Sequence, residues 1–313
     1  MNSFAVAVVI ASHRPQFIGD LLLSLNESII QSNLLVQVIV VADYEVKEFS
    51  SAFPNVVWKF LNDISISAKR NLGCSYAESD LIAFVDDDCK VDNCWILTGY
   101  QYLHDNPDIA AVEGKTTVEV PDDAPGMIKE YKRLEKPGFR TNNLFYRKSV
   151  FVDAGCFDER FTVQREDLDL AFSVLTNNGK IAFCEQLKVN HRFRKGEWWD
   201  LLKNAINRRF DPLLYKKFPY LYRKYVKTPF PKSYLLLLFV HIITLISFIA
   251  DQVTFFIVAD LLFSSALASR RSGFKVGYPK RFFPELFCVL LAPFLFLVSL
   301  VYGSIKFRKF LLL

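Results

Sequence analysis

Two runs of small and β-branched residues constrain the fold more than any other feature of this sequence. Residues 5–11 read AVAVVIA, and residues 36–42 read VQVIVVA. These runs lack the polar alternation of a half-exposed strand and are typical of strands that are covered on both faces of a parallel sheet. The sequence therefore predicts a sheet with helices on both sides.

A helical pattern at 16–30 separates these two strands, and a second one at 65–78 separates further predicted strands at 56–61 and 81–85. Alternating strands and helices of these lengths predict a parallel, doubly wound, Rossmann-like α/β fold. Ligands bind such sheets beyond the carboxyl ends of the strands. Because His13, Asp43 and the acids at 86–88 lie at those ends, we expect them to line one crevice.

The next hundred residues continue this pattern less regularly. Strands are expected at 109–113, 143–146 and 180–184, and helices at 148–153 and 167–177. Neither a Gly-x-Gly-x-x-Gly turn nor a Walker-type loop occurs. Their absence disfavours a nicotinamide-dependent dehydrogenase and a P-loop enzyme.

The C-terminal part is much more apolar, with runs at 234–250, 253–268 and 286–303. Each is a little shorter than the roughly 20 residues of a spanning helix. Basic residues before the first run and after the second predict a hairpin with both flanks in the cytoplasm. The third run would then cross once, or enter the membrane and return.

A segment rich in Lys, Arg and aromatic residues precedes these runs, between Arg208 and Lys232. Such a composition could bind nucleic acid through phosphate contacts and stacking. Its place just before an apolar run favours anionic membrane lipid, so we expect no nucleic-acid partner. We therefore predict a catalytic domain over 1–215, a basic-aromatic juxtamembrane segment over 216–232, and a membrane region over 233–313 with two or three hydrophobic helices.

Two further features predict that the catalytic domain faces the cytoplasm. The six cysteines show no paired metal-binding spacing, as expected for reduced thiols. The N-terminus begins with a strand-like run in place of a signal peptide.

The stretch LIAFVDDDC, residues 81–89, runs from an apolar strand directly into three carboxylates. Carboxylates beside an apolar core need a positive partner. A solvated turn is the plain alternative, but the crowding favours a hard cation, Mg²⁺ or Mn²⁺, shared with substrate phosphates. Such an ion would neutralise the charge that develops on a diphosphate leaving group.

The context of these acids resembles a known family. Residues 65–88, SISAKRNLGCSYAESDLIAFVDDD, resemble the corresponding stretch of family-2 glycosyltransferases with the GT-A fold. Three further segments resemble the same family. They are VAVVIASHRP, QVIVVAD and the acceptor half, TNNLFYRKSVFVDAGCFDERFTVQREDLDLAFSVLTNNGKIAFCEQLKVNHR. The resemblance covers roughly residues 4–195 and implies the GT-A variant of the nucleotide-sugar fold.

The resemblance implies a nucleotide-sugar site at the strand ends. Asp43 would accept a hydrogen bond from the nucleobase, and Arg70 would contact the nucleotide near its base or phosphates. Asp86 would hold the ribose or a metal-bound water, and Asp87 would add to the negative field. His13 would line the site near the nucleobase.

The resemblance also implies metal-binding and acceptor-side residues. Asp88 would ligate the metal, and His191 would contact the metal or the diphosphate. Asp167 matches the catalytic base, which accepts the proton of the acceptor hydroxyl during an inverting displacement. Glu166 and Asp169 are alternative bases, with an ordinary interpretation as acids at a helix start.

One departure from the family narrows the expected activity. Processive polysaccharide synthases carry a Gln-x-x-Arg-Trp motif, and the expected place here reads NAINRRF, residues 204–210. We therefore expect a single-addition enzyme of cell-envelope polysaccharide synthesis. It would transfer a sugar from a nucleoside diphosphate to a membrane-linked acceptor, such as a polyprenyl-linked glycan. Direct transfer to polyprenyl phosphate and a non-catalytic, membrane-anchored scaffold that binds nucleotide sugar are the alternatives.

Overall fold

The computed structural model describes residues 3–62, 65–120, 130–193, 197–226, 230–249, 253–272 and 282–311. The chain divides into two compact units. The first comprises Met1–Glu119 and Lys132–Phe193, and the second comprises Val120–Tyr131 and Arg194–Leu313. The contact-based division thus falls earlier than the boundary at 215 that composition predicts, and the limits of the catalytic domain stay a prediction.

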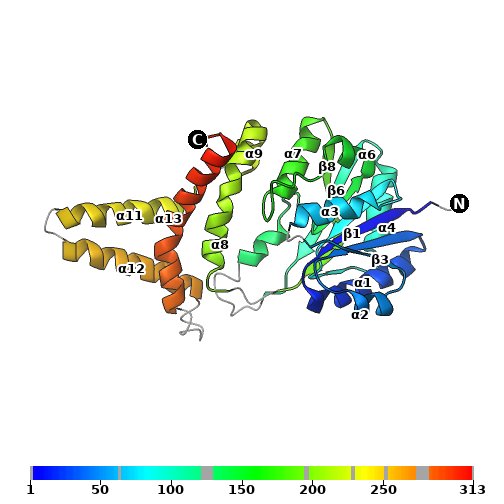
Figure 1. Cartoon of the computed structure of the whole chain (residues 1–313), viewed down its shortest axis with the longest axis horizontal. Coiled ribbons are helices and arrows are strands. Elements are labelled where there is room, and N and C mark those ends of the chain that lie inside the picture. Colours follow the sequence, from blue (N-terminus) through cyan, green and yellow to red (C-terminus); the bar gives the residue numbers. More distant parts are fainter. Residues whose placement is uncertain are drawn as a thin grey trace. The chain divides into compact units, whose positions relative to one another are not determined.

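The first unit is built around one eight-stranded sheet with the order β3-β2-β1-β4-β7-β6-β8-β5 (Figure 1). Its strands are β1 (Val6–Ser12), β2 (Val36–Ala42), β3 (Val56–Phe60), β4 (Leu81–Val85), β5 (Cys89–Val91), β6 (Ile109–Thr117), β7 (Asn143–Arg147) and β8 (Lys180–His191). The strands β1 to β4 pair in parallel, as the sequence predicts.

The second half of the sheet is mixed. β7 lies between β4 and β6 and is antiparallel to both, whereas β6 and β8 are parallel. The short strand β5 pairs antiparallel with the end of β8, so that Cys89 lies opposite His191. This pairing, which the sequence did not predict, brings the acids after β4 beside the end of β8.

Helices cover both faces of the sheet, as the apolar runs predict. Alternate residues of β1, Val6, Val8 and Ile10, pack with Leu21 and Trp95 in one core. Ala7 and Val9 pack on the opposite face, in a core that includes Leu170 and Val174. The helices of this unit are α1 (Pro15–Ser32), α2 (Lys47–Ala52), α3 (Ile66–Ser75), α4 (Trp95–Asp105), α6 (Lys148–Asp153) and α7 (Glu166–Thr176). In Figure 1, α1 and α2 lie on one side of the sheet and α3 on the other.

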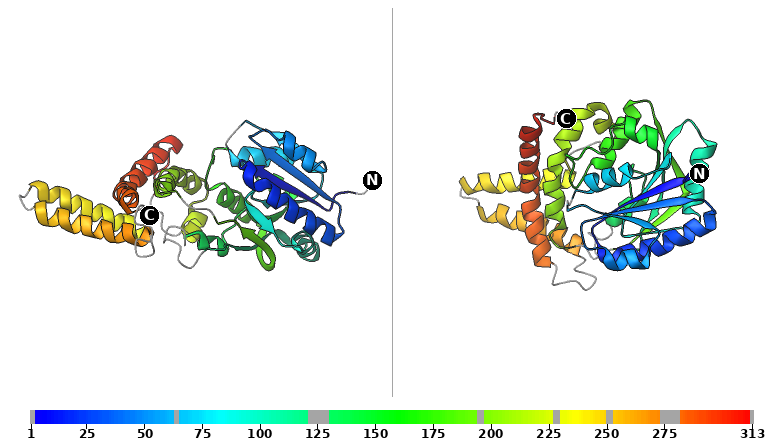
Figure 2. Two further views of the ribbon diagram at one scale, coloured as in Figure 1. Left: turned by 90° about the horizontal axis from the view of Figure 1, so that it is seen from below. Right: turned by 45° about the vertical axis from the view of Figure 1, so that its right-hand side comes forward.

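The second unit is helical. A 3₁₀ turn η1 (Glu130–Glu135) lies at its first boundary, and its elements are α8 (Asp200–Asn207), η2 (Arg208–Phe210), α9 (Asp211–Lys217), α10 (Pro219–Leu221), η3 (Tyr222–Val226), α11 (Lys232–Ile249), α12 (Val253–Ser272) and α13 (Phe282–Phe307). Both views in Figure 2 show α11 and α12 running side by side.

The three predicted apolar runs correspond to α11, α12 and α13. Among the described residues, one helix is long and apolar enough to cross a membrane, namely α13. This 26-residue helix exceeds the run at 286–303 because it begins earlier, at Phe282, and ends later, at Phe307.

Candidate active site

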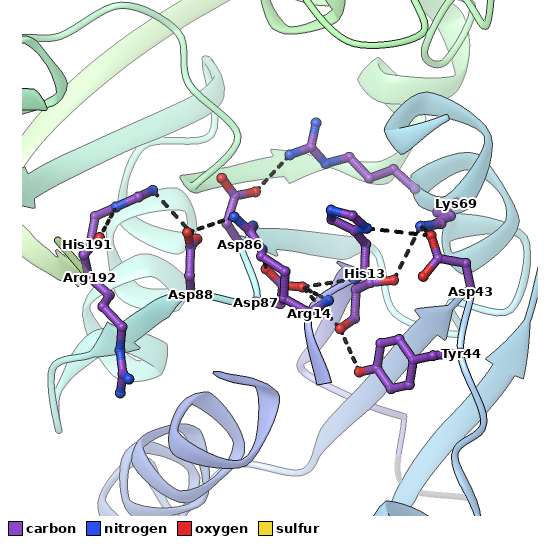
Figure 3. A network of polar contacts seen from close by, with 12 residues as sticks. His13, Arg14, Asp43, Tyr44, Lys69, Asp86, Asp87, Asp88, His191 and Arg192 are labelled. Carbon is purple, nitrogen blue, oxygen red and sulfur yellow. Dashed lines mark hydrogen bonds and ion pairs between the residues drawn. The ribbon is translucent and has the colours of Figure 1, made fainter. Parts of the chain in front are cut away.

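The carboxyl ends of β1, β2 and β4 meet at one edge of the sheet. Ser12 is in register with Ala42, and β4 pairs with β1 on its other side. The residues that follow these strands, His13, Asp43 and Asp86, therefore lie together, as Figure 3 shows. The arrangement is the one that parallel strands impose on any loop residues at their carboxyl ends.

Asp87 is the structural centre of this edge. Its Oδ2 accepts hydrogen bonds from Ser12 Oγ at 3.1 Å and from the backbone amides of His13 and Arg14 at 2.9 and 3.0 Å. Its Oδ1 accepts from Arg14 Nε and Nη2 at 2.8 and 2.5 Å. Both oxygens of this fully buried side chain thus bind the protein's own turn. Asp87 thus holds the β1–α1 turn, and its expected contribution to the negative field of the nucleotide-sugar site stays a prediction.

Arg14 is a cation that the sequence argument overlooked. Its Nη1 donates to Asp88 Oδ2 at 2.8 Å while the same guanidinium binds Asp87. Burial alone would lower the pKa of Arg14, but Asp88 and Asp87 raise it above its ordinary value. Arg14 therefore supplies part of the positive charge that the three acids at 86–88 require.

Arg70 joins the strand-end acids to the start of α7. Its Nη2 donates to Asp86 Oδ1 at 2.9 Å, and its Nη1 contacts Glu166 Oε1 at 3.4 Å and Asp167 Oδ1 at 3.3 Å. The guanidinium also lies over the ring of Phe157, at 5.4 Å from its centroid. Arg70 is thus buried among carboxylates, where the resemblance implies a contact to the nucleotide.

Asp167 is held by the protein on both oxygens. Thr141 Oγ1 donates to its Oδ1 at 2.6 Å, and the Thr141 amide donates to its Oδ2 at 3.4 Å. Burial raises the pKa of Asp167, while Arg70 and the Thr141 hydroxyl oppose that rise. A carboxylate with a raised pKa is a better proton acceptor, which suits a general base.

The two neighbouring acids of α7 have different surroundings. Burial and the charge of Asp167 raise the pKa of Glu166 to about 8. Asp169 lies two residues after Asp167 on the helix and is 1% exposed, so it is turned into the protein. Of the three predicted acids, Asp167 and Glu166 lie at Arg70.

A further cation, Lys69 of α3, reaches the end of β2. Lys69 Nζ donates to Asp43 Oδ2 at 2.5 Å and to the Ser12 carbonyl at 3.2 Å, and the lysine side chain is 2% exposed. His13 Nδ1 lies 3.7 Å from the same Asp43 oxygen. The Tyr44 hydroxyl is 2.7 Å from Ser12 Oγ, and burial raises the pKa of Tyr44 to about 12. These groups surround Asp43 at the edge where a nucleobase is expected.

Asp88 and His191 approach each other as the predicted metal ligands should. His191 Nε2 lies 3.5 Å from Asp88 Oδ1, and its Nδ1 lies 3.0 Å from the Arg192 carbonyl. The Cys89 thiol is close to both, with all three ligand atoms within 4.8 Å of one another. A carboxylate oxygen and an imidazole nitrogen suit Mn²⁺ or Mg²⁺ completed by phosphate oxygens and water, whereas a thiol sulfur suits softer metals. The pair Asp88–His191 therefore fits the expected cation.

The sequence identified the acids of this site better than their partners. Arg14, Lys69 and Thr141 carry much of its geometry. Each lies within a segment that resembles the family, in SHRP, ISAKRN and TNN respectively. The pattern of apolar and charged residues gives no signal for which strand end each of these side chains will reach.

Comparisons with known proteins agree with this fold. The family described as "Glycosyl transferase family 2" matches residues 6–163, half of the chain. That range contains the ends of β1, β2 and β4 and stops shortly before α7.

Two curated proteins of Haloferax volcanii are similar in sequence. Glycosyltransferase AglE is 26% identical over 187 residues, covering 52% of this chain and 62% of that protein. Glucosyl-dolichyl phosphate glucuronosyltransferase is 23% identical over 148 residues, covering 41% of this chain and 47% of that protein. The chain thus spans about half to three fifths of the length of these relatives.

A solved structure has a similar fold. The crystal structure of S. aureus TarS, residues 1–349 in complex with UDP, aligns with a TM-score of 0.51 at 14% identity. The alignment covers 97% of this chain and 92% of that chain. The fold predicted from the resemblance is thereby confirmed.

Proposed function

The chain belongs to glycosyltransferase family 2, and we propose that it transfers a sugar from a nucleoside diphosphate to a membrane-linked acceptor in one inverting displacement. The observation that carries the proposal is the bridge made by Arg70. One guanidinium holds Asp86 on the donor side and Asp167 on the acceptor side, at 2.9 and 3.3 Å. The carboxylates that the two substrates require are thereby fixed beside each other.

On the donor side, Asp43 would accept a hydrogen bond from the nucleobase, with His13 and Tyr44 lining the same end. Asp86 would bind the ribose. Asp88 and His191 would hold Mg²⁺ or Mn²⁺, which when bound neutralises the negative charge of the diphosphate. Asp87 would act indirectly, because it holds the turn between β1 and α1 beside these residues.

On the acceptor side, Asp167 would take the proton of the acceptor hydroxyl. The acceptor oxygen forms a bond to the anomeric carbon while the bond to the diphosphate oxygen breaks on the opposite face, which inverts the configuration. The nucleoside diphosphate leaves with the bonding electron pair. Thr141 and Arg70 orient the base for this transfer, since both bind its Oδ1.

The second unit and the name of one relative support the proposed acceptor class. The helices α11, α12 and α13 present large apolar side chains outward, such as Leu245 at 70% and Phe283 at 76% exposure. Such surfaces are typical of contacts with a membrane or with another protein, and the apolar length of α13 favours a membrane. The name of one relative, glucosyl-dolichyl phosphate glucuronosyltransferase, describes transfer to a sugar on a lipid phosphate. We take a lipid-linked glycan at the cytoplasmic face as the acceptor, with single addition.

Release of nucleoside diphosphate by the full-length protein in detergent tests this proposal. Donors with different bases and sugars would be combined with lipid-linked glycan or with plain polyprenyl phosphate. We expect release and a one-sugar product with the lipid-linked glycan. Transfer to polyprenyl phosphate alone would support the alternative acceptor, and no release with any pair would support the binding scaffold.

Asp167→Asn separates an enzyme from a scaffold within the same assay. The amide still accepts the Thr141 hydrogen bond but cannot take a proton, so turnover should fall by about 10²–10⁴-fold with nucleotide binding kept. Asp153→Asn, a change of an exposed acid at the end of α6, is the matched control and should keep full activity. Unchanged turnover in Asp167→Asn would remove Asp167 from the role of base.

A further inference from the structure

Glu113 is a buried carboxylate in the middle of β6 that the proposed chemistry does not use. Its side chain is turned into the protein, and the residue is 5% exposed. Its oxygens accept hydrogen bonds from three successive backbone amides. Gly138 N lies at 2.9 and 3.1 Å from the two oxygens, Phe139 N at 2.9 Å and Arg140 N at 3.1 Å.

These hydrogen bonds stabilise the loop at 138–140 in a backbone conformation that is otherwise unfavourable. Phe139 has φ of 60°, a left-handed conformation that a residue with a Cβ rarely adopts. Burial raises the pKa of Glu113, and the amides of Arg140, Gly138 and Phe139 oppose that rise. A carboxylate that binds three adjacent amides favours one conformation of the loop over all others.

The loop ends at the residue that holds the proposed base. Thr141 follows directly and is fully buried, with its hydroxyl 2.6 Å from Asp167 Oδ1 and its amide 3.4 Å from Oδ2. A continuous set of contacts therefore runs from Glu113 through 138–140 to Thr141 and Asp167. A shift of the loop by 1 Å would break the short hydroxyl contact, because hydrogen bonds weaken steeply with distance and angle.

We propose that Glu113 is a positioning residue for glycosyl transfer, which holds the 138–140 loop so that Thr141 orients Asp167. The inference rests on the proposed function, because Asp167 is a base only in that reaction. Glu113 itself touches neither substrate nor Asp167 in this account. Its contribution passes through the loop and the Thr141 hydroxyl.

The direction in which the pKa of Asp167 moves separates a positioning role of Glu113 from a purely electrostatic one. The Thr141 hydroxyl lowers the pKa of Asp167, so a loosened loop should raise it. Removing the negative charge of Glu113 without moving the loop should instead lower the pKa of Asp167, by relieving repulsion. The other ionisable groups that face Asp167 are unchanged in such a variant: Arg70, Asp86, Arg140, Tyr146 and Glu166.

The test uses Glu113→Gln in the full-length protein in detergent, with two readouts. Hydrogen exchange of the 136–142 segment should become about tenfold faster, because the amide group of Gln cannot accept all four contacts. In the transfer assay, kcat at neutral pH should fall about tenfold and the acid limb of the pH profile should move to higher pH. Glu185→Gln, a change of an exposed acid on β8, is the matched control and should alter neither readout.

Variants of Thr141 complete the test. Thr141→Val should move the acid limb in the same direction, and Thr141→Ser, which keeps the hydroxyl, should restore the normal profile. In a Thr141→Val background, Glu113→Gln should add little further shift, because both changes remove the same contact.

Three results would overturn the inference. In an active wild type, an acid limb that moves to lower pH would assign Glu113 a purely electrostatic effect. Unchanged exchange at 136–142 would show that Glu113 does not hold the loop, whatever the activity. Additive shifts in the double variant would show that it does not act through Thr141. A wild type that transfers no sugar would instead contradict the proposed function, and the inference with it.

Discussion

The two compact units of this chain differ most in where their large apolar side chains lie. In the first unit, buried acids at the strand ends are matched by cations from other elements, as with Arg14, Lys69 and Arg70. In the second unit, large apolar side chains face outward along α11, α12 and α13. Buried acids of this unit are also paired among the described residues, as His241 Nδ1 with Asp260 Oδ2 at 2.6 Å and Arg271 Nε with Glu285 Oε2 at 3.2 Å.

This difference indicates that the surfaces of the two units are suited to different surroundings. The first unit has an apolar core on each face of its sheet and places its charges in a network at one edge. The second unit would leave much apolar surface in water, which a membrane would cover. The predictions that follow test whether the network and the helices are as separate as this comparison implies.

The largest expected effect on stability is that of Asp87→Ala. The substitution removes the acceptor of five hydrogen bonds and leaves Arg14 with Asp88 as its ion-pair partner, so we expect a loss of about 3–5 kcal/mol in free energy of unfolding. Denaturant unfolding followed by tryptophan fluorescence would measure it. Asp105→Ala, a change of an exposed acid at the end of α4, is the control. A loss below about 1 kcal/mol would contradict the anchoring role of Asp87.

A smaller effect concerns the pH dependence of stability. Because the folded-state pKa of Glu166 is raised to about 8, the folded protein holds this proton more tightly than the unfolded chain. The contribution of Glu166 to stability is therefore greatest at acid pH and declines as the pH rises from about 4.5 through 8.

Glu166→Gln tests this dependence. The variant should gain stability relative to the wild type between pH 5 and pH 8, by an amount on the order of a few kcal/mol. Melting temperatures of both proteins across this range would measure the gain. A constant difference at all pH values would show that folding does not raise the pKa of Glu166.

The smallest expected effect is confined to the second unit. Asp260→Asn weakens the contacts to His241 and to Ser264 Oγ, which lies 3.2 Å from Asp260 Oδ1. Exchange of the α11 and α12 amides in detergent should rise about tenfold, equivalent to about 1.4 kcal/mol. Exchange in β1 and β2 should stay the same, and Thr254→Ala, a change of an exposed residue of α12, should alter neither. A parallel increase in the sheet would show that the units are coupled.

The sequence was sufficient for the parts of the fold that local patterns determine. The β-branched runs predicted β1 and β2, and their strand ends predicted that His13, Asp43 and the acids at 86–88 would lie together. The antiparallel insertion of β7 between β4 and β6 was not predictable in the same way. Strand direction depends on crossovers between distant segments, which periodicity does not encode.

The sequence pattern also could not predict which acidic and basic side chains of the site pair with each other. Asp87 follows a buried strand just as Asp86 and Asp88 do, yet it turns inward to Arg14, which is 73 residues away in the chain. In the turn after β4, Asp86 reaches Arg70, whereas Asp87 and Asp88 both reach Arg14. Which of them faces the substrate edge depends on the turn after β1.

The most direct test of the central claim is the thermal stability of the full-length protein with a panel of nucleoside diphosphates. Each would be measured with and without Mn²⁺, beside Asp88→Asn and the control Asp105→Ala. The account predicts stabilisation by one base, at about 2–3 kcal/mol at a hundred times the Kd, which requires Mn²⁺ and is lost only in Asp88→Asn. No stabilisation by any nucleotide in folded protein would contradict the proposed donor site, and stabilisation that persists in Asp88→Asn would contradict its metal.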